Sequence, residues 1–246
     1  MTTPDSLDMP INLTHHFLIA MPSLMDDTFS KSVVYMCEHS ERGALGLVIN
    51  KPSAMSMKAL FEKVDLPLGR EDLSATPVFQ GGPVHTERGF VLHEALHSDS
   101  WVSTSETSPS SPSLSPSPSS PSGEPDATLR DHAAPPLDAE EPDETPLQTS
   151  IYASTLTIPG GLEMTTSRDV LEALSTGAGP KRVLISLGYA AWAQGQLESE
   201  IAENSWLTVD ADPAVIFDTP IEKRYDKALS LLGLESWMIS PGAGHA

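Results

Sequence analysis

The stretch from Ser32 to Asn50, SVVYMCEHSERGALGLVIN, decides the fold class of this chain. Its two ends, residues 32–38 and 44–50, are rich in β-branched and aromatic residues, which favour strands. The residues between them, 41–43, are Glu-Arg-Gly and suit a tight connection. The stretch therefore predicts a β-hairpin.

Shorter apolar runs on both sides of this hairpin predict further elements. Strands are expected over 16–21, 76–80, 89–93, 151–158, 183–187, 206–209 and 214–217. Helical spacing of apolar residues predicts helices over 55–64, 196–204 and 221–232, and a capping box of Thr166 and Asp169 predicts another that runs to Leu174. Strands come first and helices mix in later without strict alternation, so we expect an α+β fold rather than a doubly wound parallel sheet.

One segment differs from the rest in composition. Residues 103–148 contain eleven Ser and ten Pro and no aromatic residue, so burial there cannot offset the entropy of ordering the backbone. We predict a disordered, acidic, Ser/Pro-rich insertion that interrupts a single domain over 10–246, with residues 1–9 as a flexible N-terminus. About 200 residues remain, enough to bury roughly 70% of the unfolded chain's surface.

Charge and cysteine content limit the function classes. The net charge of −20 repels phosphate backbones, so direct nucleic-acid binding is not expected. Cys37 is the only cysteine, which excludes an intrachain disulfide and a zinc site built on cysteines. The acidic N-terminus lacks the apolar core of a signal peptide, and no apolar run is long enough to span a membrane. We therefore expect a cytoplasmic protein without membrane contact.

Several blocks of sequence resemble the bacterial YqgE/AlgH family. They are LTHHFLIAMPSL, VVYMCEHS, GALGLVINKP, FQGGPV, RGFVLHE, MTTSRDVLEAL, LGYAAWAQGQLESEI, NSWLTV and the terminal PGAGHA, in that order. The resemblance implies a compact α+β domain with a mixed, partly barrel-like sheet flanked by helices, in a bacterial cytosol. The family has no established biochemical activity, although some members are described as transcriptional regulators of alginate synthesis.

The segment His93-Glu94-Ala95-Leu96-His97 matches the H-E-x-x-H pattern of zinc proteases. That pattern binds zinc only on a helix, where the two His lie on one face, whereas residues 89–93 are predicted to form a strand. We therefore interpret the segment as a strand end with exposed polar residues, and expect no metal. No motif for a nucleotide or another cofactor is present, so none is expected.

Cys37 and His39 are the best catalytic candidates in the sequence. Two residues apart on a strand, they are expected on one face, where a Cys–His pair can form an activated thiolate. The alternative is that Cys37 is a small buried hydrophobic residue and His39 begins a turn.

Three other segments are candidates for ligand binding. Gln80, Gly81 and Gly82 precede Pro83 in a turn whose N–H groups suit an anion, although such a turn needs no ligand to explain it. Thr166, Ser167 and Arg168 lie at a predicted helix start, where anions are stabilised and where capping is the simpler explanation. Tyr189 and Trp192 offer aromatic surfaces at a predicted strand-to-helix junction, or pack in the core.

These observations favour a regulatory or accessory protein that acts by contact with another protein or a small anionic ligand, without catalysis. An alternative is a hydrolase or thiol-dependent enzyme that uses Cys37 and His39. A third is a transcriptional regulator, for which the acidic charge disfavours direct DNA contact.

Overall fold

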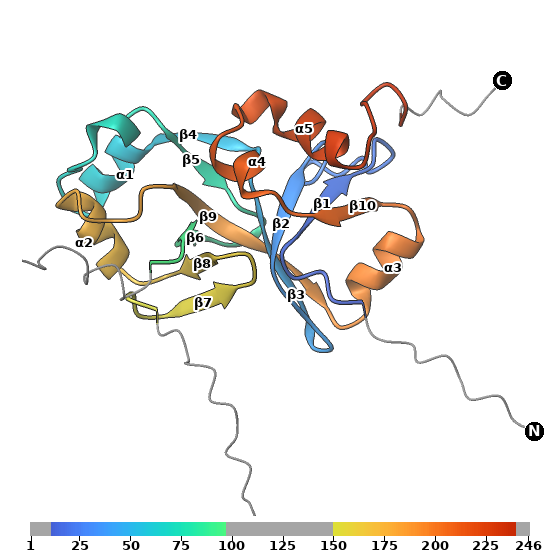
Figure 1. The fold of residues 1–246 in the computed structure, drawn as a ribbon, viewed down its shortest axis with the longest axis horizontal. Coiled ribbons are helices and arrows are strands. Elements are labelled where there is room, and N and C mark those ends of the chain that lie inside the picture. The colour runs from blue at the N-terminus through green and yellow to red at the C-terminus, as the bar shows by residue number, and fades with distance from the viewer. Residues whose placement is uncertain (1–10, 97–149, 240–246) are drawn as a thin grey trace, which may run out of the picture. The chain divides into compact units, whose positions relative to one another are not determined.

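The hairpin predicted from Ser32 to Asn50 is present in the computed structural model, which describes residues 11–96 and 150–239 (Figure 1). Strand β2 (Val33–Ser40) pairs antiparallel with β3 (Gly43–Val48), and Val34 lies opposite Val48. Nearly all residues of both strands are buried, because the pair lies inside a larger sheet.

In the described residues, ten strands form this sheet, in the order β10-β1-β2-β3-β9-β6-β8-β7, with β5 also beside β9 and β4 beside β5. The remaining strands are β1 (His16–Ala20), β4 (Pro52–Ser56), β5 (Pro77–Gln80), β6 (Val84–Glu94), β7 (Thr155–Ile158), β8 (Leu162–Thr165), β9 (Val183–Ala193) and β10 (Trp206–Asp210). All pairs are antiparallel except β5 with β9. Strand β9 joins the two halves of the sheet, since its last residues pair with β3 and its first residues pair with β6.

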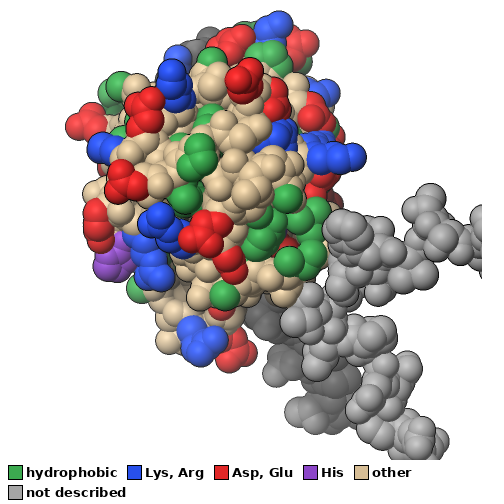
Figure 2. All heavy atoms as spheres, turned by 90° about the vertical axis from the view of Figure 1, so that its left-hand side faces the viewer, with side chains coloured by type: hydrophobic (Ala, Val, Ile, Leu, Met, Phe, Trp, Pro, Cys, Tyr) green, Lys and Arg blue, Asp and Glu red, His purple; other side chains and the backbone are tan. Residues whose placement is uncertain are grey.

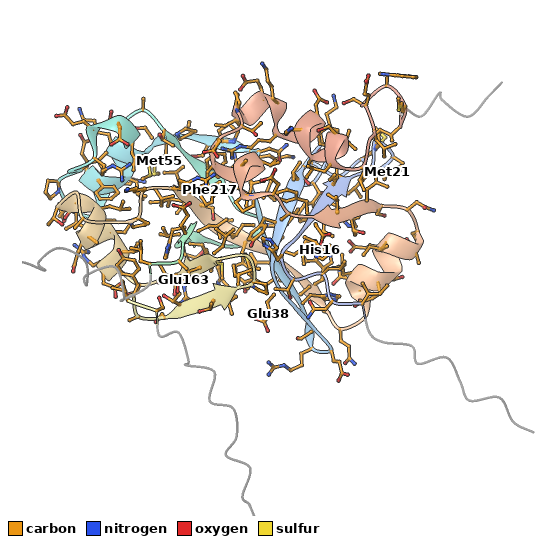
Figure 3. The ribbon with its side chains drawn as sticks, in the orientation of Figure 1. His16, Met21, Glu38, Met55, Glu163 and Phe217 are labelled. Atoms are coloured by element: carbon orange, nitrogen blue, oxygen red, sulfur yellow. The ribbon has the colours of Figure 1, made fainter. Side chains whose placement is uncertain are left out.

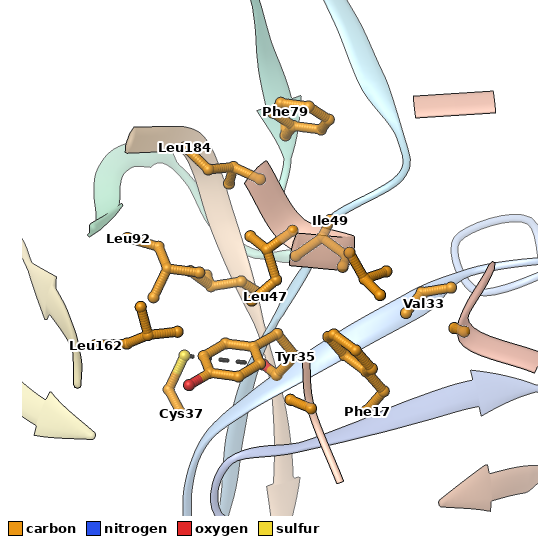
Figure 4. Close-up of a cluster of buried hydrophobic side chains, with 14 of the residues drawn as sticks. Phe17, Val33, Tyr35, Cys37, Leu47, Ile49, Phe79, Leu92, Leu162 and Leu184 are labelled. Atoms are coloured by element: carbon orange, nitrogen blue, oxygen red, sulfur yellow. Dashed lines mark hydrogen bonds between the residues drawn. The ribbon is translucent and has the colours of Figure 1, made fainter. Parts of the chain in front are cut away.

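The sheet curls into a half-barrel, and the five α-helices found in the described residues cover its faces. They are α1 (Met57–Lys63), α2 (Asp169–Ser175), α3 (Gln196–Ala202), α4 (Pro213–Phe217) and α5 (Arg224–Leu231). Residues from both halves of the sheet pack with α4 and α5 in the largest core cluster, which includes Phe17, Tyr35 and Leu92 (Figure 4). The expected α+β fold with a partly barrel-like sheet is confirmed.

Two further core clusters lie under the other helices. Helix α3 contributes Leu197 to a cluster with Trp192 of β9 and Trp206 of β10. Helices α1 and α2 cover the opposite half of the sheet, where Phe61 and Leu174 pack with Val91, Ile185 and their neighbours. Figure 1 shows α3 at one end of the sheet and α1 with α2 at the other. None of the helices in residues 11–96 and 150–239 is long and apolar enough to cross a membrane.

Two local predictions were wrong because a capping signal was misread. Residues 214–217, predicted as a strand, lie in helix α4, where Asp212 caps the first turn through Ala214 N–H at 2.9 Å and Pro213 occupies the first position. The capping box of Thr166 and Asp169 does not form. Helix α2 begins only at Asp169, whose carboxylate accepts the Ala153 N–H at 2.8 Å.

Three element boundaries also differ from prediction. Residues 52–56 pair with β5 as strand β4, so helix α1 begins later than expected, after Ser56 caps it through Ala59 N–H. Of the predicted strand over 151–158, only β7 is a strand, because the chain turns at Ser154, whose φ is 51°. Strand β9 continues well beyond Leu187. The predicted insertion over 103–148 and the N-terminus over 1–9 lie outside the described residues.

Candidate functional site

A β-bulge separates the two residues of the predicted Cys–His pair. The register of β2 against β3 shifts between Met36 and Glu38, so that Cys37 is the extra residue. Cys37 packs with Tyr35 in the largest core cluster, whereas His39 lies opposite Ala44, which belongs to the cluster under α3. The expectation that Cys37 and His39 share a face was therefore wrong, because the bulge turns His39 to the other side.

Each of these two side chains has partners of its own. The Cys37 thiol is 1% exposed, and its Sγ lies 3.8 Å from the carbonyl oxygen of Tyr35 (Figure 4). Burial, together with the neighbouring Glu38 carboxylate, raises the pKa of the thiol. His39 Nδ1 accepts the Leu13 N–H at 3.0 Å, so its Nε2 carries the proton that is donated to Glu198 at 2.8 Å. His39 thus ties β2 to Leu13 and to α3 through both of its ring nitrogens.

His93 of the H-E-x-x-H segment is a strand residue, as predicted, but it is fully buried rather than exposed. Its Nδ1 lies 2.8 Å from the Glu94 carbonyl, and its ring packs edge-on against Tyr152. Figure 3 shows Glu163 on β8, and His93 lies opposite Glu163 where β6 pairs with β8. His97 lies outside the described residues. Within 11–96 and 150–239, no three His, Cys, Asp or Glu side chains are grouped as metal ligands would be.

Trp192 is a packing residue in this structure. Its indole is buried and donates to Glu200 Oε2 at 2.9 Å, and the indole of Trp206 donates to the same oxygen at 2.8 Å. Gln196 donates to the other carboxylate oxygen at 2.9 Å. The Glu200 carboxylate thus holds α3 against β9 and β10.

Gly81 and Gly82 lie against the backbone of β9. A Cβ on Gly81 would lie 2.2 Å from the Gly188 carbonyl oxygen, and one on Gly82 would lie 2.2 Å from the backbone of Tyr189. Only glycine allows this approach. The Gly81 N–H donates to the Leu187 carbonyl at 2.9 Å, so close packing of two strands explains the glycines and uses one of the N–H groups proposed for an anion. Gln80, just before them, is an exposed residue that ends β5.

Strand β6 carries a wide bulge against β9 soon after Pro83. Val84 pairs with Tyr189 and Gly89 pairs with Leu187, so the four residues between Val84 and Gly89 oppose a single residue of β9. We call residues 85–88 the β6 bulge. His85 begins it with a positive φ of 48° and stacks on the ring of Tyr189 at 5.9 Å. Bulges of this kind often accompany functional sites.

The β6 bulge borders a cleft of about 280 Å³. We call it the bulge cleft. Its walls come from α1, β6, the start of α2 and β9, and the residues that line it are Leu60, Val64, Glu87, Arg88, Gly89, Val91, Thr166, Ser167, Arg168, Leu171, Ile185 and Leu187. The structure therefore brings three of the predicted ligand-binding residues, Thr166, Ser167 and Arg168, to a cleft beside the β6 bulge. A fourth, Tyr189, stacks on His85 of this bulge. Cys37, His39 and Trp192 are not among its lining residues.

The bulge cleft combines an aliphatic floor with two arginines. Arg168 donates to the Val64 carbonyl at 2.9 Å and to Glu172 at 3.3 Å, which fixes its side chain at the rim. Arg88 is exposed and has no hydrogen-bond or ion-pair partner in the part of the chain that the structure describes. Figure 2 views the α1–α2 side of the molecule, where Lys and Arg side chains lie among Asp and Glu and next to apolar patches.

Gly89 keeps the floor of the cleft open. An added Cβ at this lining position would have no heavy atom within 4 Å, and its φ is not positive, so a side chain there would meet open space without strain. Sequence reasoning missed Arg88, Gly89 and the aliphatic floor. The available signal was a glycine inside a strand pattern, which often marks a bulge.

Comparisons with known proteins place the chain in a family. A family model described as DUF179, AlgH-like, matches residues 17–115 and 139–237. A UPF0301 protein of Paracidovorax citrulli is 62% identical over 237 residues, which cover 96% of this chain and 97% of the relative. A UPF0301 protein of Variovorax paradoxus is 60% identical with the same coverage.

Two solved structures share the fold. The solution structure of the AlgH protein from Pseudomonas aeruginosa matches with a TM-score of 0.61 and 37% identity, covering 98% of this chain and all of that one. A crystal structure of a Corynebacterium diphtheriae protein matches with a TM-score of 0.54 over 93% of this chain and 88% of that one, at 17% identity, and so supports the fold alone. The family match and the relatives named UPF0301 show that the chain belongs to the AlgH-like DUF179 family.

Proposed function

We propose that this protein is a regulatory or accessory protein that acts by binding a small amphipathic anion in the bulge cleft. The observation that carries the proposal is the combination of an open aliphatic floor with Arg88 and Arg168 at the rim. Ligand pockets are typically apolar with a few well-placed polar groups, and this cleft has that composition.

The floor is suited to an acyl chain. Leu60, Val64, Leu171 and Leu187 come from α1, α2 and β9, and each remains only partly buried. Covering these side chains with a ligand would remove apolar surface from water at about 25 cal/mol per Å². An apolar body that fills the cleft is therefore favoured.

The rim is suited to a carboxylate or a similar anionic head group. Arginine presents a planar fork that matches a carboxylate, and Arg88 has this fork free among the described residues. Arg168 is held in place by Val64 and Glu172, which lowers the entropy lost on binding. Glu87, also at the rim, excludes a second negative charge and so favours a monovalent anion over a dianion.

Calorimetric titration with octanoate tests the proposal. We expect saturable binding of octanoate and at least tenfold weaker binding of 1-octanol, which has the same chain without the charge. Gly89→Leu should abolish binding by filling the floor, whereas Gly89→Ala should retain it, because only the larger side chain reaches across the cleft.

A charge-matched pair of variants isolates the rim. Arg88→Gln should weaken octanoate binding about five- to tenfold, because one charge-assisted hydrogen bond is lost. Arg42→Gln removes the same charge from the exposed β2–β3 turn and should have no effect. Equal affinity of the wild type and Gly89→Leu would contradict the proposal, and so would equal effects of the two arginine substitutions.

A further inference from the structure

Arg224 is a buried cation without a carboxylate partner. The first residue of α5, it is 6% exposed, and burial lowers the pKa of its guanidinium to about 10. None of the acidic side chains in the described ranges forms an ion pair with it. Burying a charge without a counter-ion is costly, so such a group calls for an explanation.

Backbone carbonyls and an aromatic ring hold the guanidinium in one orientation. Its Nε donates to the Thr219 carbonyl at 3.1 Å, and its Nη1 donates to the carbonyl of Ile49 at the end of β3. Its Cζ lies 5.0 Å from the centre of the Phe79 ring. The third corner, Nη2, has no hydrogen-bond partner among residues 11–96 and 150–239, so two N–H groups remain free to donate.

Arg224 lines a second, smaller cleft of about 180 Å³, which we call the Arg224 pocket. It lies between α4, the start of α5 and the first residues of β9, and Figure 3 shows Phe217 of α4 above that part of the sheet. The residues that line it are Leu73, Thr76, Phe79, Lys181, Arg182, Val183, Leu184, Ile216, Phe217, Ile221 and Arg224.

The lining of the Arg224 pocket is basic, although the protein carries a net charge of −20. Lys181, Arg182 and Arg224 line it, and no acidic residue does. Arg182 is neutralised by Glu94, at 2.9 Å, and by Asp218, but Lys181 has no ion-pair partner in the described part of the chain. Two basic residues without an ion-pair partner in the described ranges, Arg224 and Lys181, therefore line one small space.

We propose that the Arg224 pocket binds a small oxyanion of the phosphate class. A phosphate group supplies the negative counter-charge that Arg224 and Lys181 lack, and its oxygens accept hydrogen bonds from a guanidinium with good geometry. Thr76 is among the residues that line the same space, and its side chain carries a hydroxyl that can donate. The volume is below the range typical of larger metabolites, which limits the ligand to free phosphate or a short phosphate monoester. This site is separate from the bulge cleft and shares no lining residue with it.

Equilibrium unfolding in phosphate tests this inference. Urea midpoints are measured over 0–50 mM sodium phosphate at constant ionic strength, with sodium chloride as the balancing salt, and binding is confirmed by calorimetry. The wild type should be stabilised as phosphate replaces chloride, because a ligand that binds only the folded state shifts the unfolding equilibrium. No difference between phosphate and chloride would overturn the proposal.

Substitutions at two residues, Arg224 and Lys181, locate the effect. Arg224→Met removes the cation at similar volume and should abolish phosphate binding. Lys181→Gln alters an exposed rim residue that is not needed for folding and should weaken phosphate binding three- to tenfold. If Arg224→Met does not fold, Lys181→Glu decides the matter, since it should weaken binding at least tenfold. Wild-type phosphate affinity in Lys181→Glu would overturn the proposal.

Two further arms separate the possible sources and the two clefts. Glycerol 3-phosphate is titrated beside inorganic phosphate, and the tighter of the two indicates whether the ligand is an ester or the free ion. Gly89→Leu, which fills the bulge cleft, should leave phosphate affinity unchanged. A loss of phosphate binding in Gly89→Leu would place the anion in the bulge cleft and contradict an Arg224 site.

Discussion

Polar side chains near the two ends of strand β9 differ in whether they have hydrogen-bond partners. At its C-terminal end, Trp192 and Trp206 both donate to Glu200, and Gln196 donates to the second carboxylate oxygen. At its N-terminal end, Ser186 Oγ and the Nε2 of the neighbouring His93 are buried without a hydrogen-bond partner in the described ranges. Both clefts described above border this N-terminal half of β9.

The difference separates structural polar groups from candidate functional ones. Buried polar groups are usually satisfied within a protein, and each exception needs a reason. The Glu200 cluster is complete without a ligand, so it explains stability. The free groups at the other end cost stability, although neither Ser186 nor His93 lines one of the two clefts.

The largest effect is expected at the satisfied end. Glu200→Ala leaves the indole N–H groups of Trp192 and Trp206 without an acceptor and should lower the free energy of unfolding by about 2–4 kcal/mol. Urea unfolding measures this change. Glu203→Ala removes the same charge from an exposed position at the end of α3 and should cost less than about 0.5 kcal/mol. Equal costs would show that the Glu200 cluster does not hold α3.

How far the sequence predicted this arrangement differs between fold and site. The hairpin over 32–50 and most strands followed from local composition, because β-branched and aromatic residues favour strands. The bulge at Cys37 did not, because one extra residue leaves no mark on composition, yet it reversed the face of His39. Asp212-Pro213 was a readable capping signal that was overlooked.

The clefts could not be predicted from local patterns, because their residues are distant in sequence. Thr166, Ser167 and Arg168 were predicted as ligand residues because they lie at a helix start, and α2 does begin directly after them, but the cleft that they line with α1, β6 and β9 was not foreseen. No sequence pattern indicated that Arg224 is buried, since an arginine in an amphipathic helix is normally on the exposed face. Only tertiary packing shows that it is buried and unpaired.

A second prediction concerns His93, which lies beside the N-terminal end of β9. Burial lowers the pKa of His93, although the Glu94 carbonyl and the Glu163 charge oppose this shift. The folded state therefore resists protonation, and stability should fall as the pH drops from about 6.5, the value of a free histidine, towards the lower pKa of the folded state. One proton corresponds to a slope of at most about 1.4 kcal/mol per pH unit.

The slope is measured by urea unfolding between pH 5 and 8. His93→Asn keeps a donor for the Glu94 carbonyl but does not titrate, so the curve of this variant should be flatter than that of the wild type. His15, whose pKa is also lowered by burial, is retained in both proteins and contributes equally. Parallel curves would show that His93 does not titrate on unfolding.

A third prediction concerns Cys37 in the largest core cluster. Because the Cys37 thiol is buried and its pKa is raised, a thiol reagent at neutral pH should react slowly with the native protein and rapidly in urea. Cys37→Ala should cost about 1 kcal/mol, as a small core truncation does. Fast labelling of the native protein would instead support the thiol-dependent enzyme.

The smallest effect on stability is expected at the cleft rim. Arg88 has no partner in the described part of the chain, so Arg88→Gln should change the free energy of unfolding by less than about 0.5 kcal/mol. Arg168→Gln should cost more, because this arginine donates to Val64 and Glu172. If Arg88→Gln is the more destabilising, then Arg88 has a structural role and is not free for a ligand.

Titration of ¹⁵N-labelled protein with octanoate, followed by two-dimensional NMR, locates any ligand by residue. Binding in the bulge cleft predicts concentration-dependent shifts of the amides of Arg88, Gly89, Leu171 and Leu187, and none at Thr219 beside the Arg224 pocket. The Gly89→Leu protein should show no such shifts. Shifts confined to other parts of the molecule, or identical shifts in wild type and Gly89→Leu, would contradict the assignment of this cleft as the functional site.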